Sequence, residues 1–249
     1  MNISRQTDSV PGFYENKIMN PRTLMVIGTA AVLLLAGIVI VGIFPGILTG
    51  AAVRGPVPLD GVEVRSYQGE DLSSINDFHE NSIRGPQYIN SSGYRLTVTG
   101  LTKKTRVYTY DEVLSGFTHY SKVTTLHCVE GWDVTLLFEG VLVRDLIAGS
   151  GVDPRANTVI FTAHDGYTTS FPLDYFMNHD ILMAYKMNNV TLPAERGYPF
   201  ELVAEDKWGY KWIKWIEKIE LTDDPKYRGY WEERGYSNTG DLNRSYFQE

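Results

Sequence analysis

The chain contains a single cysteine, Cys128, in the segment TTLHCVEGW at residues 124–132. A lone cysteine excludes an intramolecular disulfide framework and any zinc or iron–sulfur site built from several cysteines. Three roles stay open from the residue type alone: an inert core residue, a nucleophile, or the single thiolate ligand of a metal. A free cysteine commonly packs as a small hydrophobic residue, so the surrounding sequence has to decide between them.

The residues next to Cys128 favour a metal-bound thiolate over a free one. The β-branched run at 123–127 predicts a strand that ends just before a turn at Gly131. His127 would then point to the opposite face of the strand, which weakens a cysteine–histidine catalytic pair. Glu130 would raise the pKa of the thiol if it shared the face of Cys128. A metal resolves this conflict, because a coordinated thiol is deprotonated outright.

An apolar run near the start of the chain has the length of a membrane span. Residues 24–44 read LMVIGTAAVLLLAGIVIVGIF, within a charge-free stretch from 23 to 53. A helix of ~20 apolar residues crosses the hydrocarbon core. We therefore expect an N-terminal tail at 1–23, an uncleaved transmembrane helix at 24–48 and a linker at 49–74, with a cleaved signal peptide as the alternative.

The basic residues around this run indicate the orientation of the anchor. Arg5, Lys17 and Arg22 precede it, whereas Arg54 and Arg65 follow it. The positive-inside rule then favours a cytoplasmic N-terminus, so we expect a single-pass membrane protein whose catalytic domain is extracytoplasmic.

The remaining residues, 75–249, have the composition of one folded domain. Short strands are predicted at 94–100, 123–127, 158–162, 182–187, 200–204 and 216–221. Helices are predicted only at 108–114, with Thr109 as N-cap, and at 141–148. This order favours an α+β fold with mostly antiparallel or mixed sheets over a doubly wound nucleotide-binding fold. The net charge of −7 argues against a nucleic-acid partner, which would need a basic surface.

Several separated segments together resemble the sulfite-oxidase-like family of molybdopterin-dependent oxidoreductases. HCVEGW is followed by DGYTTSFPLD at 165–174, ILMAYKMNN at 181–189, LPAERGYPFELVAEDKWGYKWIKWIEKIEL at 192–221 and GYWEERGY at 229–236. They occur in the order found in the family, and the resemblance covers residues 75–240.

The resemblance implies a buried Mo-molybdopterin cofactor and assigns roles to residues of this chain. Cys128 would be the protein ligand of the metal, and soft thiolate ligation suits molybdenum while leaving tungsten open. Tyr236 would line the metal pocket as a second catalytic residue. The residues expected to bind the cofactor, besides Cys128, are Asn81, Arg196, Trp212, Ile213 and Lys214. Lys214 would hold the phosphate of the pterin, with Lys211 as the runner-up.

One departure from the family bears on the substrate. Glu201 stands where many relatives carry an arginine, and a carboxylate cannot donate bidentate hydrogen bonds to an oxyanion. The resemblance still implies an oxidoreductase that transfers an oxygen atom to or from a small substrate. Its electrons would be exchanged with a separate membrane or soluble carrier, because one cysteine leaves no haem-attachment motif. The alternative is a non-catalytic membrane-tethered binding module that keeps the fold without the metal.

Several other polar residues are expected to have structural roles. Lys207 and Lys211 are predicted at the surface, on a half-exposed element. His164 and Asp165 are interpreted as a turn with a satisfied carboxylate, because Asp commonly accepts backbone hydrogen bonds in turns. The isolated histidines are expected to be surface or structural residues, since none has metal-ligand spacing: His79, His119 and His179.

Overall fold

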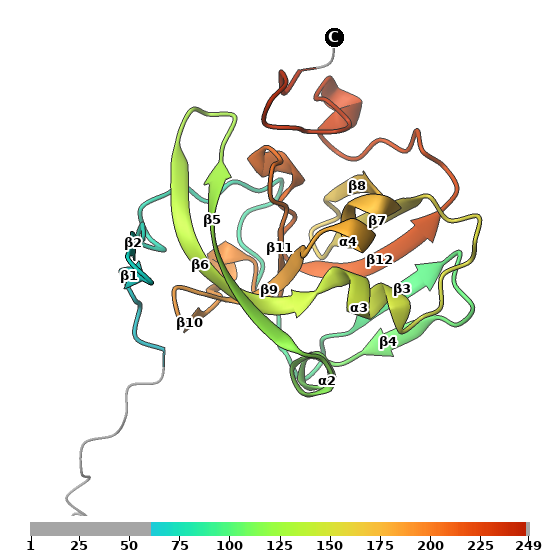
Figure 1. Cartoon of the computed structure of the whole chain (residues 1–249), viewed down its shortest axis with the longest axis horizontal. Helices are drawn as coiled ribbons and strands as arrows, with labels where there is room; N and C mark the ends of the chain where they lie inside the picture. Colours follow the sequence, from blue (N-terminus) through green and yellow to red (C-terminus); the bar gives the residue numbers. More distant parts are fainter. Residues whose placement is uncertain (1–60, 248–249) are drawn as a thin grey trace, which may run out of the picture. The chain divides into compact units, whose positions relative to one another are not determined.

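The computed structural model describes residues 61–247 of the 249-residue chain (Figure 1). Within these residues, no helix is both long and apolar enough to cross a membrane. The predicted tail at 1–23 and transmembrane helix at 24–48 lie outside the described residues. The predicted linker at 49–74 is described only from residue 61 onward.

Residues 63–74 are attached to the body of the domain. They contain the two-residue strands β1 (Ser66–Tyr67) and β2 (Glu70–Asp71), which pair with each other. Leu72 is buried, and the Ser73 amide donates a hydrogen bond to the Thr135 carbonyl oxygen at 2.9 Å. The packed part of the chain therefore starts before residue 75, because this segment buries side chains and pairs its backbone.

One five-stranded sheet carries Cys128 at the end of its longest hairpin. It contains β5 (His119–His127), β6 (Asp133–Leu142), β9 (Leu182–Met187), β10 (Val190–Thr191) and β11 (Glu201–Val203). The strand order is β10-β9-β6-β5, and β11 also pairs with β9. β5 and β6 pair antiparallel from His119↔Val141 to His127↔Asp133. Figure 1 shows the turn of this hairpin at the same end of the molecule as the red C-terminal segment.

A second five-stranded sheet has the order β4-β3-β12-β7-β8. Its strands are β3 (Leu96–Gly100), β4 (Arg106–Tyr108), β7 (Thr158–Ala163), β8 (Thr168–Pro172) and β12 (Ile216–Thr222). β12 pairs parallel with β3 and antiparallel with β7, so the sheet is mixed. One antiparallel sheet, one mixed sheet and few helices among the described residues confirm the predicted α+β class.

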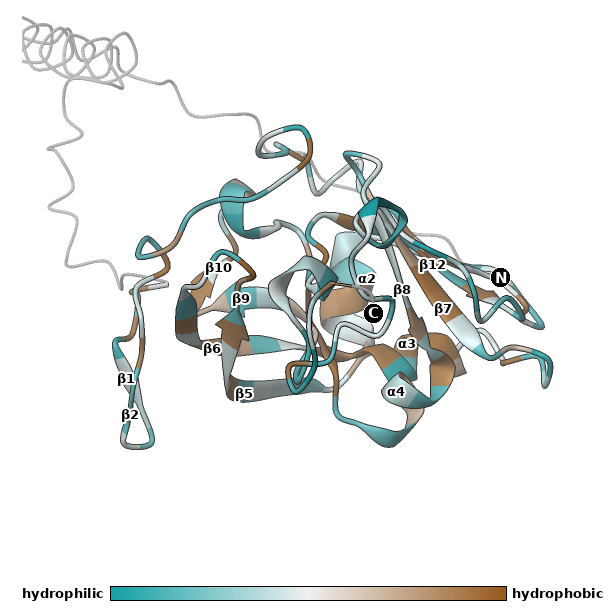
Figure 2. Cartoon of the chain, turned by 90° about the horizontal axis from the view of Figure 1, so that it is seen from above, coloured by the Kyte–Doolittle hydropathy of each residue, from teal (hydrophilic) through white to brown (hydrophobic). Residues whose placement is uncertain are grey.

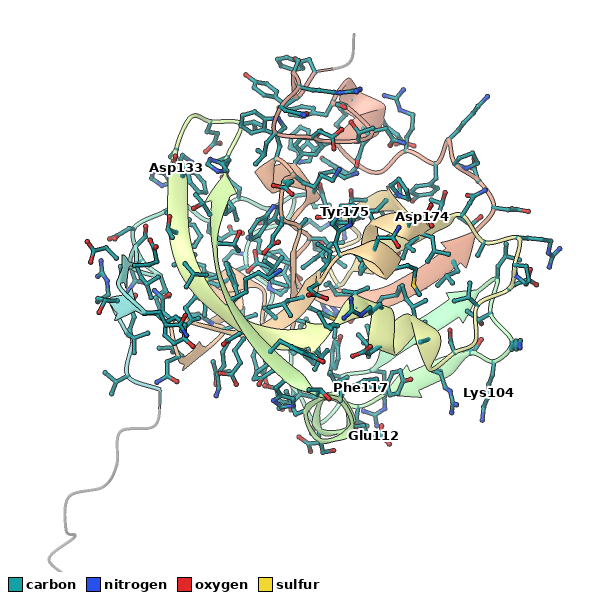
Figure 3. All side chains as sticks on the ribbon, in the orientation of Figure 1. Lys104, Glu112, Phe117, Asp133, Asp174 and Tyr175 are labelled. Carbon is teal, nitrogen blue, oxygen red and sulfur yellow. The ribbon has the colours of Figure 1, made fainter. Side chains whose placement is uncertain are left out.

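Within residues 61–247, three short α-helices connect the strands. In α2 (Tyr110–Gly116), the Thr109 side chain accepts from the Glu112 amide while the Glu112 carboxylate accepts from the Thr109 amide, a complete capping box. Figure 3 labels Glu112 at this helix and Tyr175 on α4 (Leu173–Asn178). α3 (Val143–Ala148) begins two residues later than predicted, because Leu142 still belongs to β6.

The core contains side chains from both sheets and from α3. Figure 2 shows hydrophobic colouring concentrated in the strands and α3, and hydrophilic colouring on the outer loops. β3 alternates buried and half-buried residues, as expected for a strand with one face in the core. β6 differs, since it is buried on both faces along most of its length. Its close contact with β9 depends on Gly140, where an added Cβ would lie 2.4 Å from the Met183 carbonyl oxygen.

Candidate active site

A cavity of about 300 Å³ opens where the β5–β6 turn meets the segments around residues 78–83, 195–215 and 231–236. Its size lies at the lower end of the range of small-molecule sites. The seven residues that the sequence assigned to the site all line this cavity: Asn81, Cys128, Arg196, Trp212, Ile213, Lys214 and Tyr236. These residues come from positions up to 155 apart in the chain, and the fold brings them to one place.

Cys128 lies immediately after β5, with its backbone held by the turn that follows. Its amide donates to the Trp132 carbonyl oxygen at 2.9 Å, and its carbonyl accepts from Gly131 at 3.1 Å. Gly131 has a φ of +86°, a conformation that favours glycine. Cys128 itself is only 8% exposed. The turn therefore fixes the thiol in the wall of the cavity.

The environment of Cys128 disfavours a free thiolate. Burial is the largest influence and raises the pKa of the Cys128 thiol. The Glu130 amide lowers this pKa, the negative charge of Glu130 raises it, and Asn81 lowers it by a smaller amount, so that the net shift is upward. The Glu130 amide lies 3.5 Å from Sγ and the Asn81 Nδ2 lies 3.8 Å from it. The uncoordinated group is thus a thiol at neutral pH, as predicted from Glu130.

His127 does not approach Cys128 from within the cavity. Its Nδ1 lies 3.8 Å from the Asp133 carboxylate across the hairpin, and it is not among the cavity-lining residues. The predicted opposite orientation of the two neighbours is confirmed. Within residues 61–247, moreover, no group of three or more His, Cys, Asp or Glu side chains is arranged to hold a metal ion. A single thiolate is the metal-binding feature that the described part of the chain offers in this cavity.

Asn81 connects the segment at 78–83 to the turn after Cys128. Its Nδ2 donates to Glu130 Oε2 at 3.1 Å, and the Trp132 indole donates to the same oxygen at 3.0 Å. These two hydrogen bonds lower the pKa of Glu130, so it is a carboxylate at neutral pH. Asn81 therefore lies within reach of both the thiol and a fixed negative charge.

Arg196 is buried, with an exposed fraction of 8%, and its guanidinium donates three hydrogen bonds to backbone carbonyl oxygens. Its Nε donates to the Ile75 carbonyl oxygen at 2.8 Å and its Nη2 to the Phe78 carbonyl oxygen at 2.7 Å. The guanidinium also stacks 3.7 Å from the centre of the Phe78 ring. Arg196 thus holds the segment that carries Asn81 against the cavity.

Lys214 reaches the same region from the loop before β12. Its Nζ donates to Glu80 Oε1 at 2.6 Å and to the Glu195 carbonyl oxygen at 3.3 Å. The preceding Trp212 and Ile213 are buried, and the Ile213 carbonyl accepts from the Leu202 amide at 2.9 Å. This pairing anchors the loop to β11 and fixes the direction from which Lys214 enters.

Tyr236 belongs to an aromatic cluster in the C-terminal segment. Its ring centre lies 5.0 Å from that of Tyr210 and 5.2 Å from that of Trp231. Burial raises the pKa of its hydroxyl, and the charges of Tyr246, Cys128 and Glu130 raise it further. Tyr236 therefore offers a protonated hydroxyl on the cavity wall, with its ring fixed by neighbouring rings.

Two lysines predicted at the surface are not there. Lys211 is fully buried, and its Nζ donates to Glu232 Oε1 at 2.7 Å, the Ser170 carbonyl at 2.6 Å and the Asn238 carbonyl at 3.0 Å. Lys207 is paired with Asp241 and its side chain is 11% exposed. The prediction was wrong because the C-terminal segment, far away in sequence, covers both side chains.

The turn at His164 and Asp165 matches its prediction. The Asp165 carboxylate accepts from the Tyr167 amide at 2.9 Å, while His164 pairs with Glu217 instead. Asp165 and Tyr167 nevertheless line the cavity, as do His79 and Trp231, and the sequence reasoning assigned none of these four to the site. The aromatic richness of residues 227–236 was the signal that could have identified Trp231.

Comparison with known proteins identifies a family for the segment that contains most of the cavity-lining residues. Residues 83–231 match the family model of the oxidoreductase molybdopterin-binding domain. The chain is 32% identical to the uncharacterized oxidoreductase YuiH of Bacillus subtilis over 157 residues, which cover 63% of this chain and 78% of that protein.

Two further similarities concern enzymes of sulfur compounds. The chain is 26% identical over 213 residues to MsrP, the catalytic subunit of a protein-methionine-sulfoxide reductase from Gluconobacter oxydans, covering 71% of this chain and 68% of that one. The sulfane dehydrogenase SoxCD of Paracoccus pantotrophus is similar in structure, with a TM-score of 0.54 and 24% identity over 56% of this chain and 41% of that one. The second similarity is one of fold alone.

Proposed function

Because this chain belongs to the family of oxidoreductase molybdopterin-binding domains, we propose that it transfers an oxygen atom to or from a small, uncharged sulfur compound, with sulfoxide reduction as the leading reaction. The chain is a molybdopterin-binding oxidoreductase, and its cofactor is Mo-molybdopterin. The single observation that carries the proposal is the gathering of the assigned residues around the Cys128 thiol in one cavity.

The residues of the cavity fit the cofactor. Cys128 supplies the soft ligand that a molybdenum or tungsten centre takes. Lys214 and Arg196 bring positive charge to the same wall, and a phosphate there would compete with Glu80 for Lys214. The buried Oε2 of Glu201 accepts no hydrogen bond from the described residues, which leaves a polar atom for a ligand to satisfy. Bound here, the cofactor supplies two-electron redox chemistry and an acceptor or donor for the oxygen atom.

The charges in the cavity favour a neutral substrate over an anion. Four carboxyl groups line the cavity: Glu130, Asp165, Glu195 and Glu201. Besides His79, the basic side chains that line it are two, Arg196 and Lys214. Both cations are already bonded, to backbone carbonyls or to Glu80. An anion such as sulfite would meet a net negative wall, whereas a sulfoxide carries no charge. This agrees with the name of the relative MsrP.

The chain's own residues would bind and orient such a substrate. Trp132, Trp231 and Phe78 supply apolar faces that suit a thioether, since sulfur packs well against aromatic rings. The Tyr236 hydroxyl can donate a hydrogen bond to the sulfoxide oxygen. In the net reaction the sulfoxide takes up two electrons and two protons, the sulfur–oxygen bond breaks, and a sulfide and water form.

A substrate comparison tests this proposal. The full chain from a molybdenum-replete host is supplied with reduced viologen and either methionine sulfoxide or dimethyl sulfoxide, and separately with sulfite and an electron acceptor. We expect sulfoxide-dependent oxidation of the dye, abolished by Cys128→Ala and lowered by Tyr236→Phe at unchanged pterin content. Preferential sulfite oxidation would contradict the proposed substrate class. A chain without metal or pterin would favour the alternative of a non-catalytic binding module.

A separate redox partner and a membrane tether are also part of the proposal. The name of MsrP describes it as a catalytic subunit, which supports electron exchange with another membrane or soluble protein. The charge-free run at residues 23–53 supports a single-pass anchor, with the domain on the extracytoplasmic side. Cell fractionation tests the anchor: the full chain should sediment with membranes, and a variant lacking residues 24–48 should not. Protease added to spheroplasts should digest the domain, and full protection would contradict this orientation.

A further inference from the structure

Glu201 is a buried acid in the cofactor cavity, and its side chain forms no hydrogen bond or ion pair with the residues that the structure describes. It is the first residue of β11, lines the cavity and is only 4% exposed. Its Oε2 is buried and has no hydrogen-bond partner among the described residues. Buried polar atoms without partners are rare in native proteins, and each calls for a physical explanation.

The two cations nearest to Glu201 are bonded to other groups. Lys214 donates to Glu80 and to the Glu195 carbonyl, and Arg196 donates to backbone carbonyls of residues 75–79. Gly197, with a φ of +99°, allows Lys214 and Glu201 to lie close, since an added Cβ would be 3.1 Å from carbons of both side chains. Positive charge is therefore near Glu201, but neither of these two cations donates a hydrogen bond to it.

This arrangement favours the protonated form of Glu201. An ionised carboxylate without hydrogen bonds is expensive to bury, and such a group takes up a proton instead. Burial raises the pKa of Glu201 to about 8, with Lys214 and Arg196 opposing the shift only in part. Two other acids lie near these cations: Glu80, which pairs with Lys214, and Glu195. A protonated carboxyl group carries one O–H donor, and a donor buried in the wall of the cavity needs an acceptor.

We propose that Glu201 binds the cofactor as a neutral carboxyl group that donates its O–H to an acceptor atom of the pterin or its phosphate, and that it thereby makes cofactor retention depend on pH. The inference rests on the proposed function, because it needs the cofactor in this cavity. It also gives a physical role to the acid that replaces a cationic side chain of many relatives. Deprotonation would turn the donor into a charged acceptor and weaken binding.

Cofactor retention at different pH values tests this inference directly. The loaded full chain is incubated between about pH 6 and about pH 9.5, passed through a desalting column, denatured and assayed for pterin by fluorescence. If only the protonated form binds, loss of pterin should accelerate with rising pH, by up to about tenfold per pH unit, until most Glu201 is deprotonated. Glu201→Gln keeps the shape of the side chain and a permanent N–H donor, so its pterin loss should be nearly independent of pH. Glu195→Gln is the matched control, since it removes another carboxyl from the same wall and should follow the wild type.

The outcomes distinguish a failure of the proposed role of Glu201 from a failure of the proposed function. If wild-type protein holds pterin and Glu201→Gln loses it with the same pH profile, or faster, the proposed role of Glu201 is refuted while the proposed function stands. If wild-type protein holds no pterin even at about pH 6, both are refuted. Infrared spectroscopy of the wild type gives a measurement that does not need the variant to fold. A carboxylic-acid carbonyl band should disappear as pH rises through the range in which pterin is lost, and its absence at neutral pH would overturn the inference.

Discussion

Replacement of Lys211 by methionine should destabilise the protein strongly. Its ammonium group is fully buried and donates to Glu232 at 2.7 Å, to the Ser170 carbonyl at 2.6 Å and to the Asn238 carbonyl at 3.0 Å. Lys211→Met keeps the length of the side chain but removes the ammonium group that contacts the buried Glu232 carboxylate. Breaking one side of a buried pair costs about 3–5 kcal/mol, and we expect a loss of about 4 kcal/mol in the free energy of unfolding.

A double variant separates the charge from the packing. Glu232→Gln combined with Lys211→Met removes both charges, so most of the loss should be recovered and the pair should come within about 2 kcal/mol of wild type. Lys218→Met is the matched control, because Lys218 and Glu220 form a pair at 2.7 Å in which both side chains are well exposed. Its cost should stay below about 1 kcal/mol.

Urea unfolding of the full chain, followed by tryptophan fluorescence, measures all three variants. The reasoning would be refuted if Lys211→Met cost less than about 1 kcal/mol, or if the double variant were no more stable than the single one. Either result would mean that the buried pair does not hold the C-terminal segment on β8.

Three further predictions follow from the site and the helices. In cofactor-free protein, burial raises the pKa of Glu201 from 4.5 to about 8. Wild type should therefore lose stability relative to Glu201→Gln as pH rises from about 4.5 to about 8, by on the order of 3–5 kcal/mol. Parallel urea midpoints of the two proteins across this range would contradict the assignment. Burial and Glu130 raise the pKa of Cys128, so iodoacetamide should alkylate the cofactor-free chain more slowly than a free cysteine at neutral pH, and Glu130→Gln should speed the reaction; alkylation at the free-thiol rate would argue against this environment. Thr109→Ala should cost about 1 kcal/mol in urea unfolding because it removes the capping box with Glu112, and no change would mean that α2 is held by packing alone.

Two of the strands that the sequence did not predict, β6 and β8, were missed for different physical reasons. β6 is buried on both faces, so its sequence DVTLLFEGVL shows no alternation of apolar and polar residues. The sequence of β8 does not indicate a buried strand, because Thr169 and Ser170 are polar although both are buried. Thr169 donates to Glu232 and the Ser170 carbonyl accepts from Lys211, partners that lie at least 41 residues away. Periodicity reports the face of a strand, and it carries no information about distant polar partners.

The candidate site was more predictable than the fold around it. The orientation of His127 away from Cys128 follows from the alternation of a strand, which is a local rule. The meeting of Cys128 with Lys214 and Tyr236 came from the order of the family motifs, since no spacing argument joins residues so far apart. The contacts of Arg196 with backbone carbonyls could not be predicted, because they depend on where the segment at 75–79 folds back.

Metal and pterin analysis of the purified full chain tests the central claim most directly. Protein from a molybdenum-replete host should contain close to one molybdenum and one pterin per chain, and Cys128→Ser should remain folded, with its urea midpoint near wild type, while losing the metal or its activity. Wild-type protein with neither metal nor pterin, or a Cys128→Ser variant that keeps full metal content and full activity, would contradict the assignment of Cys128 as the metal ligand.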